Sequence, residues 1–249
     1  MFDMATGPVL CVAVRQGLTD EVKRLLSCGS GVNIEIRNGP LNQSSLHIAA
    51  EEGSVMTTLL LLDHGAIVSV RDRDGWTPLH YACFKNNTNV VLILLHAGAD
   101  VCARDDFGRS PLMLLAYQSN YSLAELVLYK QADINCIDTN GMTPLHYAAA
   151  VGSISIVSLF LENGADASVL TTACESSEDI AMSRGHTRVA SILNKATATH
   201  AGQIITHVAT LQTTIATKSV SLIPAFVSRV ESLAKRVVSI SEARLSIDG

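Results

Sequence analysis

The chain has 249 residues, of which 48% are hydrophobic and 16% charged, a composition typical of a folded protein rather than a disordered one. Its formal net charge is −5, and residues 1–199 alone carry 13 Lys and Arg against 20 Asp and Glu. This acidic balance argues against nucleic-acid binding, because recognition of phosphates needs a basic stripe that the sequence lacks.

The six cysteines stand apart, without a Cys-x-x-Cys pair or a spacing typical of zinc ligands. We expect free, buried thiols that pack as small hydrophobic side chains rather than disulfides. The start of the chain lacks a cationic segment followed by a signal core, and the longest uncharged run, residues 196–217, contains several Thr and two His. No membrane span is therefore expected. The expected location is the cytoplasm, with the nucleus as the alternative.

The first predicted element is a helix pair near the N-terminus, because Leu10–Gly17 matches Leu46–Gly53 at a step of 36 residues. From residue 44 onward the step is 33 residues. A phrase of the type Thr-Pro-Leu-His marks this step, and its copies begin at Ser44, Thr77, Ser110 and Thr143. A second phrase of the type Asn-Gly-Ala-Asp keeps the same step, and residues 176–181 extend the first phrase once more. Two phrases locked at one period predict a solenoid whose repeats bury their core against their neighbours.

Each repeat is predicted to contain a hairpin tip, a first helix and a second helix, in that order. In the third repeat, Asp72–Gly75 is a run of turn-forming residues, Thr77 is suited to cap a helix with its hydroxyl, and Pro78 suits the first helical position. Small residues follow, which let the next repeat's helix approach closely. Val90–Leu95 supplies the apolar second helix, and Gly98 ends it at a position that favours a left-handed backbone.

These motifs closely resemble those of the ankyrin-repeat family over about residues 1–195. The resemblance implies an all-α repeat solenoid of helix–turn–helix units with β-hairpin tips, in about six repeats including two worn end repeats. The expected units are approximately 5–38, 39–71, 72–104, 105–137, 138–170 and 171–195. A helical tail, residues 196–249, is expected to follow this array.

The fourth repeat departs from the pattern. Met113 replaces the His of the first phrase, Leu115 replaces Ala, Ser119 replaces the Gly that ends the first helix, and Gln131 replaces the second Gly. We therefore expect its helices either to be splayed or shifted, or to repack around the changed side chains.

No residue pattern indicates catalysis, a cofactor or a metal site, so no enzyme activity is expected. His47, His80 and His146 lie a full repeat or more apart, without a Cys or carboxylate at ligand spacing. The resemblance implies that these histidines orient the hairpins by hydrogen bonding. It also implies that Asn135 is a candidate for hydroxylation by a dioxygenase, with hydrogen bonding to the loop backbone as its structural role.

The resemblance further implies that the hairpin tips and the exposed ends of the first helices form a concave binding surface. Positions there that the fold does not dictate carry the only Trp and three other aromatic residues, which are of the types that dominate binding hot spots. The acidic pairs Glu51-Glu52 and Asp105-Asp106 favour a partner protein with a basic patch. The alternative is that Trp76 or Phe107 folds back over a neighbouring loop. The predicted protein-binding residues are Trp76, Phe84, Phe107, Arg109, Tyr117, Met142, Arg73, Glu51 and Glu52.

The tail contains two apolar stripes at helical spacing, in residues 204–215 and 226–240, which Pro224 separates. Three roles stay open for it: docking on the last repeat, self-association or binding of a partner helix, and lying on a membrane surface. The predicted function of the whole chain is a protein–protein interaction scaffold that binds its partner through the concave surface. The alternative is a substrate-recognition or regulatory subunit of a larger enzyme complex, docked through the tail. A third hypothesis is the ankyrin module of a larger enzyme.

Overall fold

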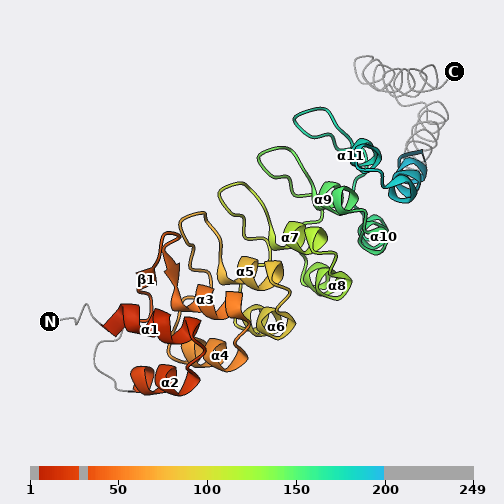
Figure 1. Cartoon of the computed structure of the whole chain (residues 1–249). Helices are drawn as coiled ribbons and strands as arrows, with labels where there is room; N and C mark the ends of the chain where they lie inside the picture. The colour runs from red at the N-terminus through yellow and green to blue at the C-terminus, as the bar shows by residue number, and fades with distance from the viewer. Residues whose placement is uncertain (1–5, 28–32, 199–249) are drawn as a thin grey trace, which may run out of the picture. The chain divides into compact units, whose positions relative to one another are not determined.

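The computed structural model describes residues 6–27 and 33–198. The chain divides after Ala190 into two compact units, and each is described by itself. The first unit consists of paired helices joined by hairpin loops (Figure 1). In the second unit the structure describes residues 191–198, which are helical. The remainder of the predicted tail, with both of its apolar stripes, lies outside the described residues.

The helices come in pairs, each with a first and a second helix joined by a short turn. The first helices are α1 (Thr6–Arg15), α3 (Ser45–Glu52), α5 (Pro78–Phe84), α7 (Pro111–Tyr117), α9 (Pro144–Val151) and α11 (Ser177–Ser183). The second helices are α2 (Thr19–Ser27), α4 (Val55–Asp63), α6 (Thr88–His96), α8 (Tyr121–Tyr129) and α10 (Ile154–Glu162). This order confirms the predicted all-α repeat solenoid. No helix in the described part of the chain is long and apolar enough to cross a membrane.

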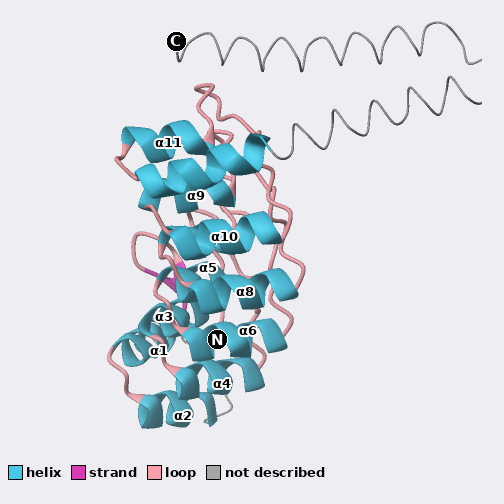
Figure 2. Ribbon diagram, turned by 90° about the vertical axis from the view of Figure 1, so that its right-hand side faces the viewer, coloured by secondary structure: helices cyan, strands magenta, loops and turns pink. Residues whose placement is uncertain are grey.

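The two kinds of helix form two rows (Figures 1 and 2). Consecutive first helices pack against one another from α1 to α11, and those from α1 to α9 each pack against the second helix of their own pair. The leucine of the repeated phrase is buried in every copy, at Leu46, Leu79, Leu112 and Leu145. Each such side chain stabilises the array by about 2 kcal/mol. Because the buried leucine recurs, the core continues from one repeat to the next.

The first helices begin where the repeated phrase predicts, and the reason is a capping box. In α5 the Thr77 hydroxyl accepts from the backbone of the third helical residue, while His80 Nδ1 accepts the Thr77 backbone N–H at 3.1 Å. Ser44 with His47 and Thr143 with His146 repeat this box. Because Nδ1 is the acceptor, the proton lies on Nε2, and these histidines cap helices rather than act chemically.

The same histidines tie each repeat to the next. His47 Nε2 donates to the carbonyl of Trp76 at 3.0 Å, and His80 Nε2 donates to the carbonyl of Arg109 at 3.1 Å. The predicted role of these two histidines in orienting the hairpins is therefore confirmed. Burial lowers the pKa of His47, and it lowers the pKa of His80 to about 4, so both rings are neutral near pH 7.

Between the helices, successive hairpins form a ladder of single backbone hydrogen bonds. Regular strand pairing occurs in the first hairpin, where β1 (Arg37–Asn38) runs antiparallel to β2 (Gln43–Ser44). The other described hairpins are turns without assigned strands, so the predicted β-hairpin tips are regular only here. One bond joins each pair of neighbouring hairpins, from Arg73 N to Leu41 O, Asp106 N to Asp74 O, Thr139 N to Phe107 O and Thr172 N to Asn140 O.

The fourth repeat keeps the geometry of its neighbours. Met113 and Leu115 are fully buried, and α7 packs on both α5 and α9. Ser119 and Gln131 adopt φ values of 57° and 66°, the left-handed conformation that glycine holds in other repeats. Of the two alternatives expected for this repeat, the structure shows repacking. The two turn residues hold a backbone conformation that side chains disfavour.

The cysteines are free in the described residues, and their burial is mixed. Cys11, Cys83 and Cys136 are buried, as predicted, whereas Cys102 and Cys174 are exposed. Burial raises the pKa of the Cys83 thiol, so this side chain packs as a small hydrophobe.

A candidate protein-binding face

A buried carboxylate organises each of three hairpin tips, at residues 72–76, 105–109 and 138–142. Asp105 Oδ1 accepts the backbone N–H groups of Phe107 at 3.0 Å and Arg109 at 2.7 Å. Asp72 and Asp138 bind the corresponding N–H groups of their own hairpins. Asp105 was predicted to form an exposed acidic pair with Asp106, but this side chain is buried and satisfies the loop backbone. Asp105 is therefore part of the scaffold and does not offer a charge to a partner.

Trp76 packs along its own first helix, against Tyr81 in the middle of α5 and Phe84 at its end. Its ring centroid lies 4.9 Å from that of Tyr81 and 5.5 Å from that of Phe84, the latter in an edge-on arrangement. Trp76 and Phe84 are both half-buried. Trp76 thus combines the two roles that the sequence left open, since one part of the ring packs on the array while the rest stays accessible.

Arg109 joins two hairpin tips into one cluster. Its guanidinium lies 5.5 Å from the Trp76 ring centroid and 5.0 Å from the Phe107 ring centroid, and Asp105 Oδ2 accepts from Arg109 Nε at 2.7 Å. Cation–π contact and the ion pair together fix the guanidinium in place. We call Trp76, Phe84, Phe107 and Arg109 the aromatic cluster.

Phe107 is the most accessible member of the aromatic cluster, with 55% of its surface exposed. Tyr117, at the end of α7, is 51% exposed, whereas Met142, at the following hairpin, is half-buried. Arg73 is exposed at the tip of the third repeat's hairpin. The predicted binding residues therefore fall on the hairpin tips and the ends of the first helices. The contacts described above bring four of them together in the aromatic cluster.

The charges on this face are largely paired. Glu51 lies 3.4 Å from the Lys85 ammonium, and Asp106 lies 2.9 Å from the guanidinium of Arg71. Glu52 is exposed at the end of α3. Neither cross-repeat ion pair was predicted, although both join residues about one repeat apart. The acidity predicted for this face is thus partly neutralised by the array itself.

Asn135 lies in the loop that follows α8, and its side chain is exposed. Its Oδ1 accepts the backbone N–H of Asp166 at 2.8 Å, and its Nδ2 donates to the carbonyl of Gly164 at 3.2 Å. These bonds match the structural role expected for this side chain, and the hydroxylation stays a prediction. Within the described ranges, no cluster of three or more His, Cys, Asp or Glu side chains is placed to hold a metal ion.

The chain belongs to the ankyrin-repeat family. A family model described as ankyrin repeats (3 copies) matches residues 10–105 and 102–171. Ankyrin repeats generally mediate protein–protein interaction, and proteins of this family are typically non-enzymatic.

Similar curated proteins share only a part of their length with this chain. The potassium channel KOR1 of Oryza sativa subsp. japonica is 44% identical over 73 residues, which are 29% of this chain and 8% of the channel. The potassium channel GORK of Arabidopsis thaliana is 39% identical over 74 residues, 30% of this chain and 9% of the channel. The human Notch-regulated ankyrin repeat-containing protein is 34% identical over 68 residues, 27% of this chain and 60% of that protein. These similarities support the fold and leave the partner open.

Proposed function

We propose that the chain is an interaction scaffold that binds a partner protein through its hairpin face, by which we mean the hairpin tips and the ends of the first helices. The observation that carries the proposal is the aromatic cluster, in which Arg109 is held between Trp76 and Phe107. A side chain that is already fixed loses little conformational entropy on binding, so the cluster is pre-organised as a hot spot.

Phe107 and Tyr117 supply the accessible apolar area of this face, and Glu52 and Arg73 lie at its edge. We infer that the aromatic residues provide most of the affinity, while the exposed charges orient the partner. Because Glu51 and Asp106 are already paired within the array, a basic patch on the partner would meet Glu52 rather than these two carboxylates.

The test is a quantitative affinity capture from cells that express the chain, comparing wild type with Phe107→Ala. Phe107 is largely exposed, so this variant should fold normally and lose a partner that wild type retains. Trp76→Ala is less suitable, because Trp76 packs on Tyr81 and Phe84 and its removal would also destabilise the array. The matched control is Tyr129→Ala, which removes an 81% exposed aromatic side chain from a second helix.

Equal recovery of every partner by wild type and Phe107→Ala would contradict the proposal. In that case a chain lacking residues 199–249 would test the alternative, a recognition or regulatory subunit docked through its tail. Loss of one partner on that deletion, with retention of another, would favour the subunit.

A further inference from the structure

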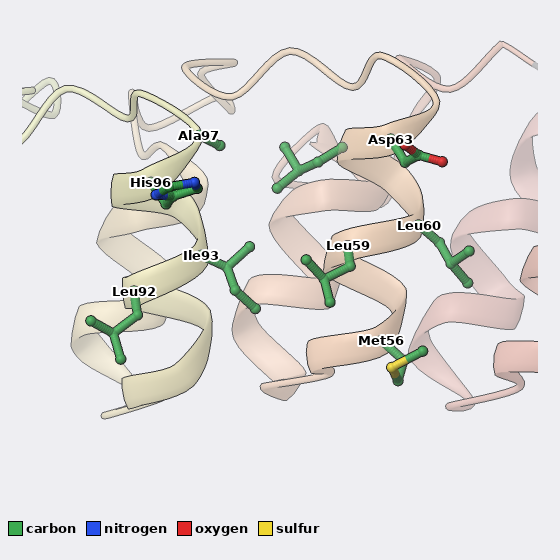
Figure 3. A pocket seen from close by; sticks show the side chains of 9 residues that line it. Met56, Leu59, Leu60, Asp63, Leu92, Ile93, His96 and Ala97 are labelled. Carbon is green, nitrogen blue, oxygen red and sulfur yellow. The ribbon is translucent and has the colours of Figure 1, made fainter.

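The second helices expose an apolar patch that the solenoid does not require. Met56 and Leu59 on α4 and Leu92 on α6 are 60%, 45% and 45% exposed. Together with Ile93 and Leu62 they line a shallow groove of about 750 Å³ between these two helices. Figure 3 shows Leu59 and Ile93 facing each other across this groove, with Asp63 and His96 at the same end of their helices.

The exposed aliphatic side chains of this patch belong to α4 and α6, and equivalent positions on the neighbouring helices differ from them. The equivalent position on consecutive second helices is occupied by Lys23, Leu59, Leu92 and Glu125, and all four side chains are exposed. One turn earlier the row reads Asp20, Met56, Asn89 and Ser122, and one turn later Ser27, Asp63, His96 and Tyr129. Stacking of repeats therefore tolerates polar residues at these positions, and the apolar ones on α4 and α6 need another explanation.

The charges that flank the patch have a self-complementary order. Along the array the central row runs cation, apolar, apolar, anion, from Lys23 on α2 to Glu125 on α8. Consider a second copy that faces the patch, related by a twofold axis parallel to the second helices and midway between Leu59 and Leu92. This rotation reverses the order of the row in the second copy. Leu59 therefore meets the second copy's Leu92, and Lys23 meets its Glu125.

The same operation places Asp63 opposite the second copy's His96, which again joins an acceptor to a donor. A twofold axis along the array would instead bring Lys23 against Lys23 and Glu125 against Glu125. Like charges in direct contact disfavour that arrangement. Of these two closed arrangements, the charge pattern thus favours the one with the twofold axis parallel to the second helices.

We propose that the second-helix patch, defined by Met56, Leu59, Leu92 and Ile93 with Lys23 and Glu125 at its ends, is a homodimer interface. Two copies associate with α4 of one lying along α6 of the other, and the apolar groove is filled by the partner's leucine side chains. The interface lies on the opposite side of the helix rows from the hairpin tips, so each dimer presents two free hairpin faces (Figure 1).

Charge exchange at the two ends tests this symmetry directly, with the full chain studied by sedimentation equilibrium over roughly 1–100 μM. In Lys23→Glu, both ends of the dimer bring two carboxylates together, and in Glu125→Lys both ends bring two ammonium groups together. Each single variant is expected to dissociate roughly ten-fold or more readily than wild type. An equimolar mixture of the two variants should restore the dimer as a heterodimer, because every end then pairs opposite charges.

The apolar part is tested by Leu92→Glu, which is expected to weaken the dimer roughly 30-fold or more. Leu92 is substantially exposed, and circular dichroism with thermal melting verifies that the variant folds. The matched control is Glu162→Lys on α10, an exposed charge reversal on a second helix outside the patch, which should leave the dimer unchanged.

Three outcomes would overturn the proposal. The first is a wild-type chain that stays monomeric over the whole concentration range. The second is a dimer that persists in Leu92→Glu, since association would then use another surface such as the tail. The third is a mixture of the two charge variants that associates no better than either variant alone.

Discussion

The hairpin at residues 105–109 and the hairpin at residues 171–175 occupy equivalent places, two repeats apart, but they are held very differently. Asp105 accepts two backbone N–H groups and the Arg109 guanidinium, whereas Thr171, at the same position, accepts the N–H of Glu175 at 3.2 Å. The turn glycine, Gly108, is replaced by Cys174, which holds a φ of 60°.

The histidine that reaches each hairpin also differs. His80 Nε2 donates to the carbonyl of Arg109, but the equivalent Nε2 of His146 is buried without a hydrogen-bond partner among the described residues. The repeated phrase is identical at both sites, Thr-Pro-Leu-His-Tyr-Ala, so the helix that approaches is the same. The difference therefore arises in the hairpin that receives the histidine. The middle hairpin thus receives a histidine hydrogen bond of normal geometry, which the C-terminal hairpin lacks.

The largest expected effect is on the pH dependence of stability. Burial lowers the folded-state pKa of His80 to about 4, below the usual value of 6.5, so the unfolded chain binds the proton more readily. This group therefore contributes stability that is present above pH 6.5 and is lost as the pH falls to about 4, by about 3 kcal/mol in total. Urea unfolding at pH 7 and pH 4 should show that His80→Met removes this part of the pH dependence.

Methionine is chosen because Met113 already fills the equivalent site in the fourth repeat. The comparison variant is His146→Met. Burial also lowers the pKa of His146, but its Nε2 lacks the hydrogen bond of normal geometry that His80 makes. At pH 7 we expect His80→Met to be the more destabilising of the two, by about 1 kcal/mol. Equal losses would mean that the bond to Arg109 contributes nothing to the difference between the hairpins.

Removal of the loop acceptor should have the next largest effect. Asp105→Ala leaves the two buried N–H groups of the hairpin without their acceptor and frees Arg109, so we expect a loss of about 2–3 kcal/mol. Thr171→Ala should cost about 0.5–1 kcal/mol, because one neutral bond is lost. Urea unfolding measures both, and similar losses at the two sites would show that the end hairpin is as well fastened as the middle one.

The turn residues allow a reciprocal exchange. Gly108→Cys copies the end hairpin into the middle, and a Cβ there would lie 3.1 Å from the Cα of Asp138 and 3.3 Å from the N of Thr139. Because backbone atoms cannot move aside easily and φ is 76°, we expect a loss of about 1–2 kcal/mol in unfolding free energy. Retention of full stability would show that the neighbouring hairpin yields.

The smallest effect is expected for the reverse change, Cys174→Gly. It should raise the unfolding free energy by about 0.5–1 kcal/mol, since glycine holds a left-handed φ without strain. Cys174→Ser keeps the backbone strain and removes the thiol, so it serves as the control and should leave stability unchanged. A gain in the serine variant would attribute the effect to the thiol rather than to the backbone.

The sequence predicted the helices well because one local signal marks each of them. Thr77 and Pro78 define where α5 begins, and the His80 ring completes the same capping box. Strand pairing was less predictable, since turn-forming residues occur at every tip but only the first hairpin, among those described, contains paired strands.

The candidate face was predictable in outline and not in its contacts. Register alone places Trp76, Phe107 and Arg109 at hairpin tips, but the stacking of Arg109 between two rings depends on the spacing of successive hairpins in space. The burial of Asp105 was missed because an acidic pair in a polar loop resembles a solvated one. Its recurrence at residues 72, 105 and 138 was the available signal.

Because one backbone hydrogen bond joins each pair of neighbouring hairpins, the ladder should separate one repeat at a time under a mechanical force. A pulling force directed along the array loads the repeats in series. At each repeat the force is resisted by one backbone hydrogen bond at the hairpin tips and by the packing of one helix pair. We expect the repeats to open one after another, beginning at the C-terminal hairpin, which lacks the histidine bond. Each step would release about 33 residues, or roughly 110 Å of extended chain. The array would thus lengthen in steps of similar size while the unfolding force stays nearly constant.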